Sequence, residues 1–390
     1  MQTGMGLRFI HTADWQLGKP FGRFDEALSG RLTAERQEAI GRIAETARTN
    51  DASHVIVAGD VWDNAAPNNA ILRQPLDIMG EHPDVTWWLM PGNHDVDGSD
   101  SLWDRVEAIA PDNLRILRSA DPVQMTDGAW LLPAPWQRLH HGRDLTDWMD
   151  KAETPAGAIR IGIAHGSIKT FGTKHEGQSS GESDAIIPPD RTARAQLDYL
   201  ALGDWHARAA INSRTHYPGT PEPDRFKTGA RGQVLLVEID APGTEPRVTD
   251  IPTAAFDWPV IDARLQLGTI DDTLAAISTH IKSGRAERYT LAEITVSGET
   301  TVQDWSTFEA FIDDLSGRCA HLDLRGTSTV DLKVIAQDIE ALDAQGSVRQ
   351  TAEALKARRE DPALSQADRD IAADALRLLF SFAATDGAPA

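Results

Sequence analysis

Cysteine is almost absent from this chain of 390 residues. Its single cysteine, Cys319, cannot form an intrachain disulfide, which excludes a disulfide-stabilised scaffold and fits a reducing compartment. No apolar run approaches the ~20 residues that a membrane helix needs, and the segment 1–6 lacks the charged and apolar regions of a signal peptide. We therefore expect a cytoplasmic protein that neither spans a membrane nor is exported.

Basic residues are also few. The chain has 38 Lys and Arg against 59 Asp and Glu, a formal net charge of −21, and the parts before and after residue 250 are both acidic. Because proteins bind the nucleic-acid backbone by neutralising phosphates with Lys and Arg, this excludes a general nucleic-acid coat protein. Any nucleic-acid role needs a local site. The content of 41% hydrophobic and 25% charged residues is typical of globular proteins and excludes a fibre or a disordered chain.

The first part of the chain has the pattern of a layered α/β domain. Short apolar runs alternate with amphipathic stretches from residue 7 to about 250, and the runs occupy residues 7–14, 54–60, 85–95, 160–166 and 197–206. The stretch 31–48 places Leu32, Ile40, Ile43 and Ala47 near helical spacing and predicts an amphipathic helix.

A domain boundary is expected where Pro, Gly and Thr concentrate, in residues 241–258. We draw it after residue 250. Residues 251–335 then predict a smaller α+β domain, with helices at 271–281 and 305–315 and strands at 289–298 and 321–324. Residues 336–390 predict a helical tail, in which Ser365 and Asp368 resemble a capping box. The final helix is expected to carry its apolar residues on one side: Ile371, Ala375, Leu378, Leu379 and Phe382.

The polar residues that end the five apolar runs carry the chemical signal. They are Asp14, Asp60, Asn93 with His94, His165, and Asp204 with His206. Strand C-termini are where α/β sheets build their sites. Oxygen and imidazole ligands converging from several strands suit divalent metals, and a shared carboxylate can bridge two of them. The set predicts a two-metal hydrolase, and no G-x-S-x-G or G-x-x-x-x-G-K-[ST] motif competes with it.

Taken singly, each residue has a simpler interpretation. Asp60 can cap a turn, Asn93 can supply turn geometry, and a lone histidine such as His165 is more often a hydrogen-bonded polar residue than a ligand. His11, inside the first run, is expected to be buried and structural. Core packing is likewise the expected role of Trp15, Trp62 and Trp205. The ordered set is what favours a metal site.

Five short motifs resemble the signatures of calcineurin-like metallophosphoesterases. They are DWQ (14–16), GDVWD (59–63), GNHD (92–95), AHG (164–166) and GDWH (203–206). Within that superfamily, HTADWQLGK (11–19), YPGTPE (217–222) and VLLVEID (234–240) resemble the nuclease subunits of SbcCD-type complexes for DNA double-strand-break repair. The resemblance covers residues 7–250 and, more loosely, the next domain, which is similar to that family's capping domain. It implies a metallophosphoesterase β-sandwich flanked by helices.

The resemblance also implies a role for each site residue. Asp14 and His206 would hold one metal, Asn93 and His165 the second, and Asp60 would bridge the two. His94 would be the catalytic acid, Asp63 would orient His94, and Asp95 would support the ligands from behind. The implied function is a DNA phosphodiesterase with 3′-to-5′ exonuclease and single-strand endonuclease activity. The implied partners are DNA, an SMC-like ATPase of SbcC type and a second copy in a homodimer.

Two positions depart from that family's pattern. Gln16 and Asp204 stand where the family usually has histidine. Gln16 can still offer an amide oxygen and Asp204 an anionic oxygen, so the site becomes richer in oxygen, which favours Mn²⁺ first, or Mg²⁺, over zinc. The opposing interpretation is a degenerate site.

Two other functions remain open. One is a phosphoesterase acting on a small nucleotide or a phosphoprotein, and the other is a non-catalytic subunit that binds DNA and an ATPase. Four further basic residues lie in loops and are weaker candidates for phosphate contacts: Arg138, Lys169, Lys174 and His175. The Gly- and Ser-rich stretch 177–183 predicts a mobile loop.

Overall fold

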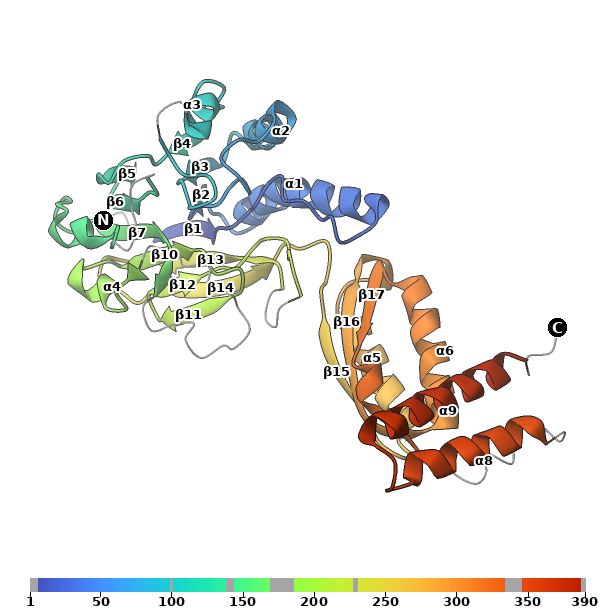
Figure 1. The fold of residues 1–390 in the computed structure, drawn as a ribbon. Helices are drawn as coiled ribbons and strands as arrows, with labels where there is room; N and C mark the ends of the chain where they lie inside the picture. The colour runs from blue at the N-terminus through green and yellow to red at the C-terminus, as the bar shows by residue number, and fades with distance from the viewer. Residues whose placement is uncertain are drawn as a thin grey trace. The chain divides into compact units, whose positions relative to one another are not determined.

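The computed structural model describes residues 6–98, 101–137, 144–168, 186–226, 231–333 and 346–386 (Figure 1). The chain divides into two compact units, Met1–Asp257 and Trp258–Ala390. The division falls inside the stretch 241–258, where the composition predicts a boundary. Among the described helices, none combines the length and apolar character needed to cross a membrane.

Two six-stranded sheets form the first unit. The first has the order β14-β13-β1-β2-β3-β4, and its strands are β1 (Leu7–Thr12), β2 (His54–Val57), β3 (Thr86–Leu89), β4 (Leu114–Ile116), β13 (Gln233–Ile239) and β14 (Arg247–Pro252). The second has the order β11-β12-β10-β7-β6-β5, and its strands are β5 (Val123–Thr126), β6 (Ala129–Ala134), β7 (Ile159–His165), β10 (Tyr199–Gly203), β11 (Ala209–Asn212) and β12 (Thr215–Tyr217). Strands β1 to β4 are parallel, as are β6, β7, β10 and β12. The five predicted apolar runs are therefore confirmed as β1, β2, β3, β7 and β10.

The sheets pack face to face around an apolar core. Phe9 and Ile56 of the first sheet meet Ile161 and Ile163 of the second, and all four side chains are fully buried. Alternation along each strand sends the intervening side chains to the outer faces. These outer faces are apolar too, so each must be covered by further elements.

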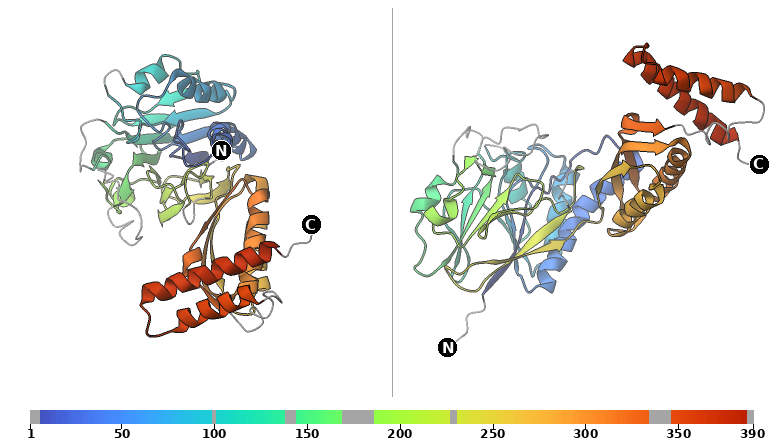
Figure 2. Two further views of the ribbon diagram at one scale, coloured as in Figure 1. Left: turned by 45° about the vertical axis from the view of Figure 1, so that its right-hand side comes forward. Right: turned by 90° about the horizontal axis from the view of Figure 1, so that it is seen from below.

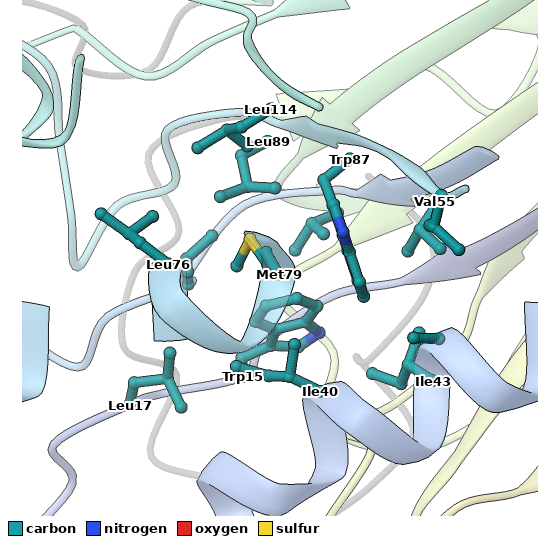
Figure 3. Packing of buried hydrophobic residues seen from close by; sticks show 14 of the residues in the cluster. Trp15, Leu17, Ile40, Ile43, Val55, Leu76, Met79, Trp87, Leu89 and Leu114 are labelled. Carbon is teal, nitrogen blue, oxygen red and sulfur yellow. The ribbon is translucent and has the colours of Figure 1, made fainter. Parts of the chain in front are cut away.

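Helices cover the outer face of the first sheet: α1 (Glu26–Thr49), α2 (Asn69–Gly80) and α3 (Leu102–Glu107). Helix α1 begins where the Asp25 carboxylate accepts a hydrogen bond from the Leu28 N–H at 2.8 Å. The four apolar residues predicted for its inner side are buried. Figure 3 shows α1 and α2 packing on the sheet around Trp15 and Trp87, whose rings meet edge to face at 5.9 Å. The second sheet is covered by the 3₁₀ helix η1 (Asp147–Lys151), α4 (Arg191–Arg194) and the short strands β8 (Ser167–Ile168) and β9 (Ile186–Ile187).

The second unit is a parallel sheet with two helices on it. Its strands are β15 (Val260–Leu265), β16 (Leu291–Thr301), β17 (His321–Arg325) and β18 (Val330–Lys333), and its helices are α5 (Ile270–Lys282) and α6 (Val302–Arg318), with short 3₁₀ turns η2 (Glu287–Tyr289) and η3 (Thr327–Thr329). The predicted helices and strands of this region are confirmed, while β15 and β18 were not predicted. The overall prediction, a β-sandwich flanked by helices with a smaller mixed unit and a helical tail, is confirmed.

Two helices end the described chain, α8 (Ser347–Glu360) and α9 (Gln366–Asp386), and they lie side by side (Figure 2). The predicted cap is present, because the Ser365 hydroxyl donates to Asp368 at 2.6 Å and accepts from its N–H at 3.2 Å. The predicted apolar side is correct at Leu379, which packs against the buried Leu376. It is wrong at Ile371 and Leu378, which are 66% and 56% exposed. Ala372 and Leu376, which were not predicted, are buried instead.

Candidate metal centre

The C-terminal ends of strands from both sheets meet at one edge of the sandwich. Asp14, Asp60 and Asn93 follow β1, β2 and β3 of the first sheet, while His165 ends β7 and Asp204 follows β10 of the second. Hydrogen bonds cross between the sheets here. His165 Nδ1 lies 2.8 Å from the Ala58 carbonyl, and the Asp204 N–H donates to both Asp14 oxygens at 3.1 and 3.2 Å. The two sheets together thus assemble a single site.

Glycines let these strand ends approach so closely. A Cβ on Gly92 would overlap the Asp60 carboxylate, and a Cβ on Gly203 would overlap the Ala58 carbonyl. The glycines of GNHD and GDWH are therefore required because each motif touches the backbone or ligand of another motif.

Three side chains form the most compact cluster. Asp14, Asp60 and His165 each offer a ligand atom, all within 4.8 Å of one another, and all three residues are at most 1% exposed. Burial raises the pKa of Asp14 to about 6, against the lowering effect of His206 and His165. Burial also acts to raise the pKa of Asp60, but the imidazoles of His165 and His94 outweigh it and leave that pKa below its usual value. Among the described residues no Lys or Arg pairs with these carboxylates, and the basic side chains that approach them are the histidines His94, His165 and His206.

The hydrogen bond of His165 determines which of its nitrogens faces the cluster. Nδ1 faces a carbonyl, which can only accept, so Nδ1 carries a hydrogen. In the neutral ring Nε2 then has a lone pair, and it lies 2.8 Å from Asn93 Oδ1, 3.5 Å from Asp60 Oδ1 and 3.9 Å from Asp204 Oδ1. Burial lowers the pKa of His165, but the surrounding carboxylates raise it well above its usual value.

The amide of Asn93 can adopt either orientation at this point. If it is reversed, its nitrogen donates to His165 Nε2 at 2.8 Å and to the Asp60 oxygens at 3.2 and 3.3 Å. With the oxygen toward His165, two acceptors face each other. That second arrangement is favourable only with a cation or a proton between them.

Gln16 belongs to the cluster through its amide nitrogen. Nε2 donates to Asp60 Oδ2 at 2.8 Å, while the buried Oε1 has no hydrogen-bond partner among the described residues. An unpaired buried amide oxygen beside two buried carboxylates is a costly arrangement. The donor set of carboxylate, amide and imidazole atoms therefore fits divalent cations.

Asp204 is also directed into the site. Its Oδ2 accepts from the Ser167 hydroxyl at 3.0 Å, and its Oδ1 lies 3.9 Å from His165 Nε2. The contact with Ser167 holds one oxygen and leaves the other toward the cluster.

His206 is held by a residue that the sequence analysis missed. Its Nδ1 lies 3.0 Å from Asp224 Oδ2, and its Nε2 lies 3.8 Å from Asp14 Oδ1. If Nδ1 donates to Asp224, the lone pair of Nε2 is directed toward the cluster, as in many carboxylate–histidine pairs at metal sites. Asp224 is buried, and although burial acts to raise its pKa, the hydrogen bond from His206 and nearby cations hold that pKa well below its usual range. Asp224 lies two residues beyond YPGTPE, and its spacing gave no signal of this contact.

His94 stands at the rim of the site. Its side chain is 44% exposed, and its Nε2 lies 3.9 Å from Asp60 Oδ2. Its Nδ1 donates to the backbone carbonyl of Asp63 at 2.9 Å. The orientation of His94 therefore depends on the main chain at Asp63, and the contact does not involve the Asp63 carboxylate.

Asp95 lies behind the ligands and joins two of the loops. One oxygen accepts from the Gly92 N–H at 2.7 Å, and the other accepts from Val61 and Trp62 at 2.8 and 3.1 Å. Burial raises the pKa of Asp95 to about 7, with a further contribution from the charge of Asp60. This carboxyl group fixes the loop after β2 against the loop after β3.

The structure brings all nine predicted site residues to this edge: Asp14, Gln16, Asp60, Asp63, Asn93, His94, His165, Asp204 and His206. The weaker candidates Arg138, Lys169, Lys174 and His175, and the stretch 177–183, lie outside the described residues. His11 is buried and lies 2.9 Å from the Tyr199 hydroxyl, away from this set.

Known proteins resemble this chain in sequence. A family model described as calcineurin-like phosphoesterase matches residues 7–226. The chain is 26% identical over 289 residues to the SbcD subunit of the nuclease SbcCD from Escherichia coli (strain K12), covering 62% of this chain and 70% of that protein. It is 24% identical over 294 residues to the corresponding SbcD subunit from Rhodobacter capsulatus, covering 63% and 69%. A solved structure from Thermus thermophilus covers 63% of this chain and 99% of its own, at 10% identity and a TM-score of 0.38.

Proposed function

The chain belongs to the calcineurin-like phosphoesterase family, and from this premise we propose that it is a metal-dependent DNA phosphodiesterase. One observation carries the proposal: Asp14, Asp60 and His165 place their ligand atoms within 4.8 Å of one another, with an exposed histidine beside them. The names of the curated relatives support a nuclease in preference to a phosphatase of small molecules.

We assign the ligands by side of the site. Asp14 and His206 would hold one divalent cation, Asn93 and His165 a second, and Asp60 would contact both. Two cations at such a site supply Lewis acidity and a nucleophile at neutral pH. Gln16 and Asp204 would add oxygen donors at the same edge.

His94 would serve as the general acid. Its Nδ1–H is engaged by the Asp63 carbonyl, so a protonated ring holds its Nε2–H beside the cluster, where Nε2 lies 3.9 Å from Asp60 Oδ2. When the bond between phosphorus and the leaving oxygen breaks, that oxygen takes the Nε2 proton. Such acid catalysis typically contributes ~10²–10⁴-fold in rate.

The decisive experiment compares substrates and metals on the purified full chain. We expect cleavage of end-labelled DNA with Mn²⁺ and none with EDTA, with 3′-to-5′ removal of nucleotides and nicking of single-stranded circles. Hydrolysis of mononucleotides or phosphopeptides without cleavage of DNA would favour the small-substrate alternative. Failure with every substrate, while DNA still binds, would favour a non-catalytic subunit.

The unusual ligands make the metal preference testable. If Gln16 and Asp204 tune the site toward Mn²⁺ or Mg²⁺, then Asp204→Ala should weaken the binding of one metal because it removes an anionic donor. Asp204→His should keep activity and shift the preference toward softer ions such as Zn²⁺ or Co²⁺, and Gln16→His should tighten the first metal. Metal titration and cleavage assays on the same variants measure this. Unchanged affinity and rate in Asp204→Ala would remove Asp204 from the ligand set.

The partner is proposed to be a cytoplasmic SMC-like ATPase of SbcC type, since the relatives are named as one subunit of a two-part nuclease. Residues 336–390 are the proposed docking segment, and Ile371 on α9 is 66% exposed. Ile371→Asp should weaken co-purification with that ATPase while Mn²⁺-dependent cleavage of short DNA persists. Undiminished co-purification would place the docking surface elsewhere. We also propose a homodimer, which sedimentation of the full chain would test.

A further inference from the structure

Two basic residues lie beside His206, Lys19 through Asp224 and Arg225 directly, and Arg23 packs on the ring of the next residue, Phe226. Lys19 and Arg23 lie in the loop after β1, and Arg225 follows the buried Asp224. We call Lys19, Arg23 and Arg225 the cationic rim. None of the three is assigned to holding a metal or to acid catalysis.

Two members of the rim share one carboxylate. Lys19 Nζ lies 2.8 Å from Asp224 Oδ2, and Arg225 contacts both Asp224 oxygens at 3.2 Å. The Asp224 side chain is only 1% exposed, whereas Lys19 is 22% and Arg225 is 48% exposed. Asp224 thus contacts two cations, Lys19 also interacts with Asp63, and the exposed Arg225 guanidinium faces solvent. Since Asp224 also contacts His206, this guanidinium lies at the edge of the candidate metal centre.

Arg23 is held by aromatic rings. Its guanidinium carbon lies 4.7 Å from the centre of the Phe24 ring and 4.8 Å from that of Phe226. Arg23 is exposed, and within the described residues it has no carboxylate partner. Rings held against the guanidinium fix its orientation, and a fixed planar guanidinium suits paired hydrogen bonds to phosphate oxygens.

A buried arginine joins the two segments that carry the rim. Arg36 is 2% exposed and donates to the carbonyl of Trp15 at 2.8 Å, to that of Pro223 at 3.3 Å and to that of Glu222 at 3.4 Å. The loop after β1 and the segment 222–226 are therefore tied to each other before any ligand arrives. Preorganisation of this kind lowers the entropic cost of binding.

We propose that the cationic rim binds the backbone phosphate of the nucleotide next to the scissile phosphodiester of a nucleic-acid strand. This inference rests on the proposed function and adds the contact that a DNA substrate needs on a chain of net charge −21. Contacts of this class position a strand without reading its sequence. Exposed rim cations flanking a metal centre are suited to that task.

Arg23→Ala is the sharpest test, because Arg23 does not contact His206 or Asp224. The probe is a fluorescent single-stranded 12-mer, and its binding to the full chain is followed by anisotropy over a range of salt concentrations. We expect affinity to fall about five- to tenfold. We expect the salt slope, the slope of log affinity against log salt concentration, to decrease in magnitude by about 0.7 to 1. Arg23→Lys keeps the charge and should retain the slope. The matched control is Arg247→Ala, which removes an equal charge on β14 beside Glu238, at the opposite end of β1.

The outcomes separate this inference from the proposed reaction. Three results would contradict phosphate binding by the cationic rim. They are an unchanged affinity and salt dependence in Arg23→Ala, an equal loss of affinity in Arg247→Ala, and no binding of the 12-mer by the parent protein. Cleavage of the 12-mer and of bis(4-nitrophenyl) phosphate is then compared, because the aryl diester has no neighbouring phosphate. If the parent cleaves neither substrate while Arg23→Ala still loses binding, the proposed phosphodiesterase reaction is contradicted and phosphate binding by the cationic rim is supported. If the parent cleaves both substrates and Arg23→Ala leaves the ratio of the two cleavage rates unchanged, only the proposed role of the cationic rim is contradicted.

Discussion

The two units both contain parallel strands, and they differ in the residues that follow those strands. In the first unit Asp14, Asp60 and Asp204 adopt positive φ angles of 55°, 55° and 96° after β1, β2 and β10. In the described part of the second unit, every residue with positive φ is a glycine, including Gly268 after β15 and Gly326 after β17.

The turns of the second unit only connect secondary-structure elements, whereas these turns of the first unit also place a carboxylate. Glycine adopts the left-handed region without steric cost, whereas another residue loses roughly 1–2 kcal/mol there. Aspartate tolerates the region better than most residues, yet the cost remains. Strained backbone of this kind persists where the surroundings hold it and tends to cluster at functional sites. In the first unit this strain falls on the aspartates that we propose as metal ligands.

A third case lies within the first unit, away from the metal centre. Asp51 follows α1 with φ 53°, and its side chain is 89% exposed. It has the backbone of the site aspartates without their burial. It therefore serves as the internal control for the predictions below.

The largest effect is expected at Asp60. Asp60→Ala should lose both metals and reduce DNA cleavage by about 10⁴-fold or more, because this carboxylate is the proposed bridge and metal chemistry supplies several kcal/mol. Bound Mn²⁺ and the rate of cleavage measure the effect. Asp51→Ala should retain both. Full metal occupancy in Asp60→Ala would contradict the bridging role.

The next largest effect is expected at His94, the exposed histidine beside the cluster. His94→Ala should retain bound metal and DNA while cleavage falls by ~10²–10⁴-fold, because it removes the proton donor but no proposed ligand. Asp63→Ala keeps the carbonyl that accepts from Nδ1, so its rate should fall by less than about tenfold. Single-turnover cleavage distinguishes the two variants. A loss of metal in His94→Ala, or equal rates in the two variants, would show that the assignment is wrong.

A smaller effect is expected where a ligand is supported from behind. Asp224→Asn should weaken one metal by about 10–100-fold, since the buried carboxylate orients His206. Calorimetric titration of Mn²⁺ should resolve this as the loss of one binding step. Glu238→Gln is the control, because Glu238 pairs with Arg8 and Arg247 at the far end of β1. Equal titrations for the two variants would contradict the role of Asp224.

The raised pKa of Asp95 should make the stability of the folded protein depend on pH. Its folded pKa of about 7 lies above the ordinary value of 3.8, so the folded state binds the proton more tightly than the unfolded state. The stability from this group is present below pH ~4 and is lost as pH rises toward about 7, by up to about 1.4 kcal/mol per pH unit. In the metal-free protein, Asp95→Asn should thus be less destabilising at pH 8 than at pH 5. Denaturant unfolding in EDTA measures this, and a constant difference would exclude the linkage.

The smallest effect is expected at Asp51. Asp51→Gly should stabilise the protein by up to about 1 kcal/mol, because it relieves the left-handed strain against the entropic cost of glycine. Gly326→Ala should destabilise it, since the new Cβ would overlap the Val296 carbonyl. Neither variant should alter cleavage. Thermal unfolding at fixed pH provides the measurement, and a destabilised Asp51→Gly would argue that Asp51 is not strained.

Much of the site could be predicted because residues with ligand-type side chains directly follow the predicted strands. Parallel strands of one sheet bring their C-terminal ends to one edge, so Asp14 and Asp60 were predictable neighbours once the strands were identified. His165 joins them from the second sheet. The partners that hold them were not predictable. Asp224 contacts His206 from an irregular segment, and the contact of Asp63 with His94 comes from its main chain. Neither contact leaves a periodic pattern in the sequence.

The sequence by itself determined the apolar strands, the long amphipathic helix of the first unit and the order of the ligand-type residues, because these follow from local periodicity and residue chemistry. Tertiary structure alone decided the contacts between distant segments. Asp204 meets Asp14 across 190 positions of the chain, and α9 buries Ala372 and Leu376 where Ile371 and Leu378 were predicted. Such contacts depend on which surfaces pack together, and packing balances burial, strain and hydrogen bonding over the whole fold. The outcome therefore cannot be predicted from any short stretch of the sequence.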